Sequence, residues 1–418
     1  MKKTIFIYFH RMREKLWFRP LLFCLVSIGG ALIAHQADGT RLDTIVPSIK
    51  IESIKGLLDT ISASMLVISI FAVASMLSAF SAASDTATPR SFKIIVTDDM
   101  SQNALSVFIG SFIFSIVATV ALDNGYYGKS GIFILFLFTL SLLALVILAF
   151  LRWVDGISRL GRLEHTISQV ESVAAKSLST HIKQPFLNAL PTTTRISDGQ
   201  SVLSKAVGYV QHVDMAALQA LGKEMDLKLQ LNCLPGDFIH KNFAIISFTT
   251  TEDLDLDEIT EKINNAIHVG DTRLFDEDPR FGIVALTEIA SKALSPGIND
   301  SGTAIQIIGS HERLFFLWKE SIENNSENTI LYDRIAVPGI SMADFFDDAF
   351  RPICKDGAGN IELMLRLQKV FKSIETINHE EIKKTAFKYS KEAYHRAELA
   401  MEFKPDLDVL KKESLFHQ

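Results

Sequence analysis

The chain has 418 residues, of which 48% are hydrophobic and 22% are charged, and its formal net charge is −6 at pH 7. This negative balance, without a long basic stripe to offset it, excludes nucleic acid as an expected partner. The three cysteines, Cys24, Cys233 and Cys354, are too widely spaced to predict a disulfide framework or a zinc site.

The first 153 residues contain four apolar stretches that carry no charged side chain. They lie at residues 21–34, 61–83, 104–122 and 131–151. The last three reach the roughly 18–20 residues that a helix needs to cross a bilayer, and the first approaches this length once Leu16, Trp17 and Phe18 are added. Because backbone groups in lipid must be satisfied within one segment, these stretches predict four transmembrane helices.

Basic residues flank the first and the last of these helices. Six Lys and Arg residues precede the first, and Arg152, Arg159 and Arg162 follow the last, whereas the connection at 123–130 carries Lys129 alone. Positive residues collect on the cytoplasmic side of a membrane. The sequence therefore predicts a multi-pass protein of the bacterial inner membrane with both termini in the cytoplasm. Residues 40–60 have near-helical apolar spacing, typical either of an amphipathic helix on the outer membrane surface or of a loop helix packed on the bundle.

The rest of the chain predicts a cytoplasmic α+β domain with a small β-rich subdomain and a mainly helical C-terminal part. The apolar spacing stays helical after Arg152, so the fourth span is expected to continue as an amphipathic helix. Short strand-like runs and a Pro235-Gly236-Asp237 turn then indicate the β-rich part. The predicted domains are a transmembrane domain at 1–153, a connecting helix and linker at 154–199, a β-rich subdomain at 200–252, and a mainly helical domain at 253–418.

A dense polar segment at 271–303 carries the most specific motif. Its string Ser295-Pro296-Gly297-Ile298-Asn299-Asp300, preceded by residues 276–282, resembles the hallmark of DUF2254, a bacterial family of predicted inner-membrane proteins of unknown function. The resemblance extends to Pro89-Arg90 and to residues 208–211 and 235–237. After the Asn-Asp pair this chain carries Ser301-Gly302-Thr303-Ala304, where the family usually has Pro-Phe-Thr-Ala. The resemblance implies a membrane topology and supplies no activity.

Three interpretations of this polar segment remain open. In the first it is structural: Pro296 and Gly297 end one helix, Asn299 or Asp300 caps the next, and Arg280 pairs with a carboxylate. In the second it holds a divalent cation, Mg²⁺ or Ca²⁺, through carboxylate oxygens; no other cofactor is implied. The candidate metal ligands are Asp276, Glu277 and Asp278.

In the third interpretation the same segment binds an anionic ligand through basic side chains and the backbone amides at a helix N-terminus. The candidate ligand-binding residues are Arg273, Arg280, Lys292, Ser295, Gly297, Asn299, Asp300 and Thr303.

Small and hydroxyl side chains recur along the second and third spans. Their spacing is typical of close helix packing, or alternatively of a hydroxyl-lined pathway through an oligomer. The candidate pore-lining residues are Ser64, Ser75, Ser78, Ser106, Gly110, Ser111, Ser115 and Thr119.

The spans carry no ionisable residue, which disfavours a proton-coupled pump or carrier. The sequence also has no Gly-x-Ser-x-Gly, His-Glu-x-x-His or Cys-x-x-Cys motif, which disfavours an enzyme. The leading hypothesis is an oligomeric channel or channel-like permeation protein that is gated by its cytoplasmic sensor domain. The alternatives are a membrane-anchored sensor or scaffold without a pore, and a membrane-tethered enzyme that acts on an anionic metabolite. The expected partners are membrane lipid, further copies of the chain, and a small ion or anionic ligand.

Overall fold

The computed structural model describes residues 17–38, 45–86, 88–96, 99–159, 162–192, 199–250, 255–323 and 329–417. The chain divides into two compact units, Met1–Thr166 and Ile167–Gln418. The predicted fold class is confirmed, because apolar helices are followed by a mixed α/β part and a helical C-terminal part.

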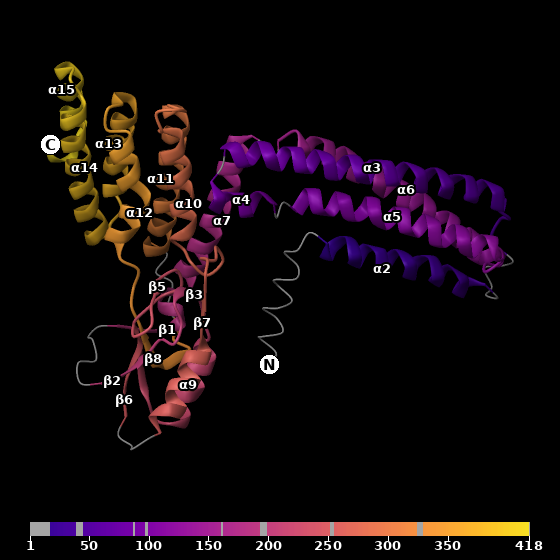
Figure 1. Ribbon diagram of the computed structural model, residues 1–418, viewed down its shortest axis with the longest axis horizontal. Coiled ribbons are helices and arrows are strands. Elements are labelled where there is room, and N and C mark those ends of the chain that lie inside the picture. The colour runs from indigo at the N-terminus through magenta and orange to yellow at the C-terminus, as the bar shows by residue number, and fades with distance from the viewer. Residues whose placement is uncertain are drawn as a thin grey trace. The chain divides into compact units, whose positions relative to one another are not determined.

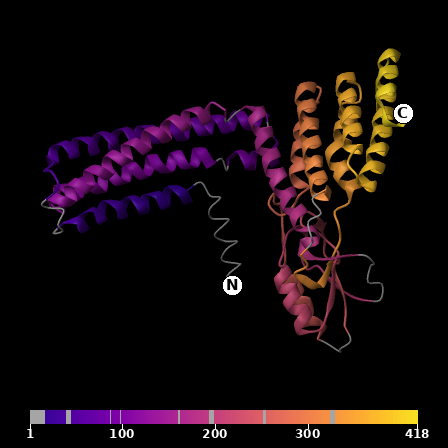
Figure 2. The same cartoon turned by 180° about the vertical axis from the view of Figure 1, so that it is seen from behind.

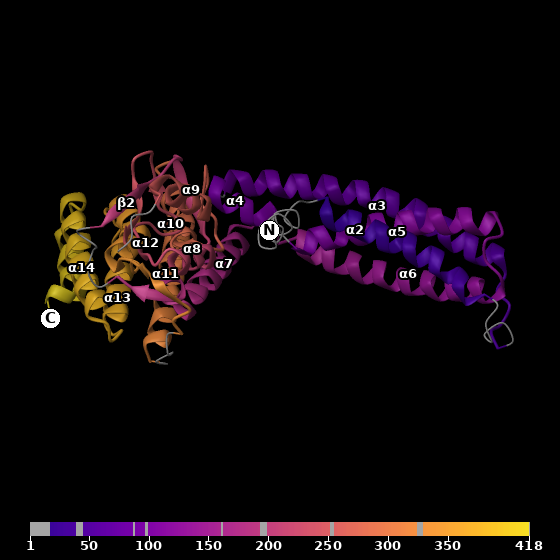
Figure 3. The same cartoon turned by 90° about the horizontal axis from the view of Figure 1, so that it is seen from below.

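The first unit consists of helices (Figures 1 and 3). They are α2 (Phe18–Ile33) with the short η1 (Ala34–Ala37), α3 (Ile51–Thr86), α4 (Pro89–Val96), α5 (Asp99–Asp123) and α6 (Lys129–Ile157). Four segments within them are long and apolar enough to cross a membrane: Phe18–Ala37, Ile51–Ala83, Met100–Asp123 and Lys129–Ile157. The four predicted spans are therefore present as helices, and each is longer than its apolar stretch.

Helix α5 lies at the centre of the first unit and contacts α2, α3 and α6. Half of its apolar window is buried within the chain, whereas the windows of the other three helices are at most 22% buried. Small side chains make this packing possible, because a Cβ atom at Gly110 would lie 3.1 Å from Phe23 Cδ1 on α2.

One end of the unit is tied together by polar contacts between different helices. The Asp38 carboxylate accepts hydrogen bonds from the Gly128 amide at 2.8 Å and the Gly131 amide at 2.6 Å, so it caps the N-terminus of α6 from a distant part of the chain. A Cβ atom at either glycine would collide with this carboxylate. At the same end the Tyr127 hydroxyl donates to the Ala31 carbonyl at 2.7 Å.

Two expectations about the helix boundaries are wrong. Residues 51–60 are not a separate surface or loop helix, because they form the first turns of the 36-residue helix α3; residues 39–44 lie outside the described part of the chain. The fourth span also does not continue as one helix, since α6 ends at Ile157 and α7 (Leu163–Lys183) begins after a break. α7 crosses from the first unit into the second.

The β-rich part of the second unit contains two sheets. Their strands are β1 (Ala189–Pro191), β2 (Gln200–Leu203), β3 (Gly208–Val213), β4 (Lys228–Leu231), β5 (Phe238–Ile239), β6 (Ala244–Thr249), β7 (Ile267–Gly270) and β8 (Tyr332–Val337). The five-stranded sheet has the order β1-β8-β4-β6-β2, and the three-stranded sheet has the order β5-β3-β7. Helices α8 (Met215–Glu224) and α9 (Leu256–Ala266) pack on their apolar core. Strands β1, β7 and β8 lie outside the predicted range of 200–252.

The C-terminal part is an array of helices that stand side by side (Figures 1 and 2). They are α10 (Phe281–Ala293), α11 (Ser301–Glu323), α12 (Met342–Asp356), α13 (Ile361–Glu375), α14 (Glu380–Ala400), α15 (Lys404–Glu413) and η4 (Leu415–His417). The short η3 (Pro185–Asn188) precedes β1 and contacts β1 and β8. Buried aromatic rings join the array, with Phe315 of α11 in contact with Phe345 and Phe350 of α12 at centroid distances of 5.1 and 5.6 Å.

Helix α7 is held to the helical array by an ion pair. Arg313 of α11 donates from Nε and Nη2 to the two oxygens of Glu171, at 2.5 and 2.7 Å. These hydrogen bonds hold the pKa of the Glu171 carboxyl below its ordinary value. Nearby, a Cβ atom at Gly282 of α10 would overlap Ala174 of α7, so a glycine is needed for this close approach.

The substitution Asp38→Ala is expected to destabilise the first unit by about 1–2 kcal/mol, because it removes the only side-chain cap that the structure gives to α6 within the described residues. Chemical unfolding in detergent micelles measures the effect. Asp38→Asn should retain part of the stability, since its one amide oxygen can accept only one of the two hydrogen bonds. Asp123→Ala, which breaks an exposed pair with Lys55, is the control and should cost little. Equal stabilities of Asp38→Ala and Asp123→Ala would contradict the capping role.

The substitution Arg313→Ala is expected to lower the stability of the second unit by about 1 kcal/mol at pH 7, since the pair is partly exposed. The pKa of the Glu171 carboxyl is lower in the folded state than in the unfolded state, where it is about 4.3. The ion pair therefore stabilises the fold fully above the unfolded-state pKa, and this stabilisation is lost as the pH falls through the folded-state pKa. The difference between wild type and variant should therefore shrink towards about pH 3. The stability of both proteins is measured by the fluorescence of Trp318 during chemical unfolding, with Trp17→Phe and Trp153→Phe present so that Trp318 is the only tryptophan in the sequence. A difference that stays constant with pH would contradict this account.

Candidate functional site

The three candidate hydroxyl side chains of the second span lie on one outward face of α3. At about 100° per residue, Ser64, Ser75 and Ser78 fall within about 60° of one another. Ser64 and Ser78 are exposed and Ser75 is half-buried, whereas Ile61, Met65, Ala72 and Met76 on the packed face of the helix are at most 5% exposed. The structure therefore brings the second-span candidates together on a surface that the chain's own described helices leave open.

The third-span candidates face the interior of the same chain. Ser106 and Ser111 are buried, and their hydroxyls donate to the carbonyls of Gln102 and Val107, both at 2.6 Å. Gly110 packs on α2, as described above. Ser115 is fully buried, and its hydroxyl has no hydrogen-bond partner among the described residues; Thr119 is half-buried. These side chains serve helix packing, and the structure does not bring them to the open face of α3.

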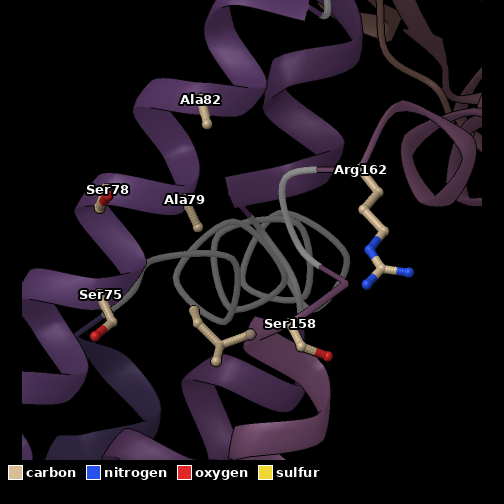
Figure 4. Close-up of a pocket in the computed structure, with 7 residues that line it drawn as sticks. Ser75, Ser78, Ala79, Ala82, Ser158 and Arg162 are labelled. Carbon is tan, nitrogen blue, oxygen red and sulfur yellow. The ribbon is translucent and has the colours of Figure 1, made fainter.

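A cavity of about 400 Å³ lies between the C-terminal half of α3 and the segment where α6 ends. Figure 4 shows the α3 residues on one side of it and Ser158 and Arg162 across from them. Its lining is Ser75, Ser78, Ala79, Ala82, Ile157, Ser158 and Arg162. It thus combines hydroxyl groups, small apolar walls and one positive charge.

The two arginines after α6 differ in their pairing. Arg159 forms an ion pair with Asp155, four residues earlier, so its charge is balanced. The Arg162 guanidinium lines the cavity and has no carboxylate partner among the described residues. Of the described residues that line the cavity, none is acidic. Among the residues that line the cavity, Arg162 is therefore the charged one, and its guanidinium contributes a positive potential next to the hydroxyl face of α3.

In the second unit, Asp278 is the centre of the polar segment. It is 2% exposed, and it accepts hydrogen bonds from Arg273 Nε at 2.5 Å and from the Arg280 amide at 3.0 Å. Burial raises the pKa of its carboxyl, and the hydrogen bond from Arg273 opposes that rise. Gly236, whose φ is +98°, lies so close that a Cβ atom would overlap this carboxylate.

The neighbouring motif elements converge on the same loop. The Gly236 amide donates to the Val210 carbonyl at 2.8 Å, and Gln211 Nε2 donates to the Thr272 carbonyl at 2.7 Å. Residues 208–211, 235–237 and 276–282, which are far apart in sequence, are therefore parts of one packed structure.

Arg280 is held by helix α12. Its Nε atom donates to Asp348 at 2.7 Å, and its Nη1 atom lies 3.3 Å from Asp344. Two of the three basic candidates for anion binding, Arg273 and Arg280, are thus neutralised by carboxylates of the chain. The third, Lys292, is half-buried on α10.

Residues 295–300 form the exposed turn between α10 and α11. The Ser295 hydroxyl donates to the Lys292 carbonyl at 2.6 Å, Gly297 is exposed, and Asn299 has a φ of +51°. Asp300 accepts from the Thr303 amide at 3.0 Å and from its hydroxyl at 2.6 Å, as the cap of α11. These hydrogen bonds, led by that of the hydroxyl, lower the pKa of the Asp300 carboxyl. The Asp300 cap agrees with the structural interpretation, whereas α10 ends at Ala293, before Pro296 and Gly297, and the positive φ lies at Asn299.

The candidate metal ligands do not converge. Asp278 is paired with arginine, Glu277 lies 3.1 Å from Nδ1 of His212, and Asp276 is exposed. Across the described ranges, no three His, Cys, Asp or Glu side chains are grouped so that they could hold a metal ion.

Sequence reasoning missed Ile157, Ser158 and Arg162 as neighbours of Ser75 and Ser78. A positive charge after the last span was visible, but it was used only to predict orientation. It also missed Asp344 and Asp348, which lie more than 60 residues after Arg280. The signal that the sequence offered was the spacing of Asp344 and Asp348, which are four residues apart and so lie one turn apart on a predicted helix.

Comparison with known proteins gives a family and distant relatives. Residues 13–373 match the family described as "Predicted membrane protein (DUF2254)". Uncharacterized proteins of Mycobacterium bovis and Mycobacterium tuberculosis are each 27% identical over 116 residues, which is 27% of this chain and 22% of theirs. No solved structure matches significantly. The match covers most of the chain, and four of its helices can cross a membrane. The chain therefore belongs to the DUF2254 family of predicted membrane proteins and is a multi-pass membrane protein.

Proposed function

We propose that the protein is an oligomeric, channel-like permeation protein of the bacterial inner membrane in which α3 lines the pathway. The observation that carries the proposal is the exposed hydroxyl face of α3, with Ser64, Ser75 and Ser78 on a helix that can cross the membrane. Hydroxyl groups offer weak, replaceable contacts to a partly hydrated ion, which permits entry and exit.

An oligomer is required because one copy encloses no pathway along this face. Several copies arranged around an axis would turn their α3 faces towards one another, with the α5 hydroxyls remaining inside each copy. The pathway proposed here is therefore lined by α3 alone, and not by α3 and α5 together.

The proposed orientation places both termini in the cytoplasm. Arg90, Arg152 and Arg162 lie at the connections and ends that would face the cytoplasm, and Asp38 and Asp123 lie at the opposite ends of their helices. The second unit would then be the cytoplasmic sensor. Helix α7 is the covalent link along which a change in that unit would reach the end of α6.

Phe71 is proposed as the hydrophobic constriction of the pathway. It lies on the same face of α3, between Ser64 and Ser75, and it is 59% exposed. Its ring makes an edge contact with Trp153 of α6 at 6.0 Å, which supports its position. A ring of phenylalanines can close a narrow pore by excluding water.

A membrane-anchored sensor or scaffold is the second candidate, and one observation favours it. The small residues of α5 serve packing within the chain, so those of α3 could equally serve packing between copies. The membrane-tethered enzyme has less support, because Arg273 and Arg280 are already paired with carboxylates.

Replacing Ser75 and Ser78 together by leucine is expected to reduce ion flux by at least about tenfold, because bulky apolar groups would remove the polar lining and narrow the pathway. Flux is measured with the purified protein in liposomes, from the dissipation of a salt gradient. The matched controls are Val73→Leu, on another exposed face of the same helix, and Ser111→Ala, inside the bundle. Both should conduct as the wild type does. An absence of flux in the wild type, or equal flux in the serine and control variants, would leave the anchor as the better account.

The substitution Phe71→Ala is expected to raise basal conductance several-fold, because a smaller side chain lets water and ions pass the constriction. Single-channel recording in planar bilayers measures open probability and unitary conductance. Ile70→Ala, which removes an exposed side chain from a different face of α3, serves as the control. The constriction is ruled out if both alanine variants behave alike.

A further inference from the structure

We infer that the species admitted by the proposed pathway is a small anion and that Arg162 is the residue that selects it. The inference rests on the proposed permeation function and names its substrate class. It is carried by the cavity between α3 and the end of α6, where the hydroxyl face of α3 meets an unbalanced positive charge.

The first step in the argument is the charge balance around the cavity. The guanidinium of Arg162 has no carboxylate partner among the described residues, while Arg159, three positions earlier, is paired with Asp155. Because a guanidinium stays protonated at every physiological pH, the cavity keeps its positive charge. A permanent cation beside a pathway raises the local concentration of anions and lowers that of cations.

The second step concerns the hydrogen-bond donors. The hydroxyl of Ser158 already donates to the Asp155 carbonyl at 2.7 Å. The hydroxyls of Ser75 and Ser78 make no hydrogen bond within the described part of the chain, so their protons are available to a ligand. Ser75 and Ser78 on α3 line the cavity on one side and Arg162 lines it on the other (Figure 4), and hydroxyl donors together with a guanidinium form a set that suits an anion such as chloride, nitrate or phosphate.

The third step is the composition of the face that leads into the cavity. Between Ser64 and Ala82 the α3 face carries hydroxyl and apolar groups, and residues 61–83 contain no charged side chain. An anion that enters past Arg162 therefore meets neither a repelling carboxylate nor a second cation that would hold it. One cation at the mouth and a neutral pathway behind it suit selective passage better than tight binding.

Reversal potentials in planar bilayers with asymmetric KCl test the inference. The wild type should reverse near the chloride equilibrium potential. Arg162→Ala should lower the ratio of chloride to potassium permeability on the order of tenfold, and Arg162→Glu should favour potassium. Arg159→Ala, in the same segment but removing a balanced charge, should keep the wild-type ratio. A cation-selective wild type, or an unchanged ratio in Arg162→Ala, would overturn the inference and leave the permeation function standing.

A binding measurement separates the two proposals. Thermal stability in detergent is recorded with chloride, nitrate or inorganic phosphate against gluconate at constant ionic strength. A stabilisation that is present in the wild type and in Arg159→Ala but lost in Arg162→Ala supports the anion site, even if the wild type does not conduct and the permeation function fails. Equal responses of wild type and Arg162→Ala to all the anions would overturn the site.

Discussion

Close packing around α5 is the constraint on which the arrangement of the membrane helices depends. A glycine at position 110 lets α2 approach, and hydroxyls such as Ser106 and Ser111 fold back onto their own backbone, so α5 can be enclosed by three other helices. One face of α3 packs on α5, so its other face can contact lipid, a pathway or another copy of the chain. The position of the candidate site follows from this packing rather than from any polar interaction within the site.

Charge balance then distinguishes the two regions that carry candidate residues. In the second unit, arginines are close to carboxylates: Arg273 with Asp278, Arg280 with Asp348, and Arg313 with Glu171. Partly buried pairs of this kind fix the relative positions of loops and helices, and removal of one partner would leave an uncompensated charge. Arg162, after the end of α6, is different, because it is exposed and has no carboxylate partner among the described residues. The same residue type therefore has a structural role in the second unit, whereas in the first we propose that it binds an anion.

The sequence predicted the four membrane helices and most C-terminal helices because each depends on the hydropathy of its own residues. It could not predict which face of α5 is buried, since a serine that lines a pathway and a serine that bonds to its own helix have the same spacing. It also predicted too narrow a β-rich region, because β8 comes from residues 332–337 and pairs in parallel with both β1 and β4. Likewise, the sequence around Asp278 did not indicate that Gly236 and Arg273 would pack against its carboxylate. Each failure concerns partners far apart in the chain, where local patterns carry no information.

The cap that Asp38 places on α6 has a consequence for biogenesis. Asp38 and the Gly128 amide that it accepts from are 90 residues apart, and the second and third membrane helices are synthesised between them. The contact can form only after the fourth helix has entered the membrane, so it completes the bundle rather than starting it. Until then the first helix lacks this connection to the last one. A chain that stops before residue 128 would therefore leave Asp38 without the amides that it caps.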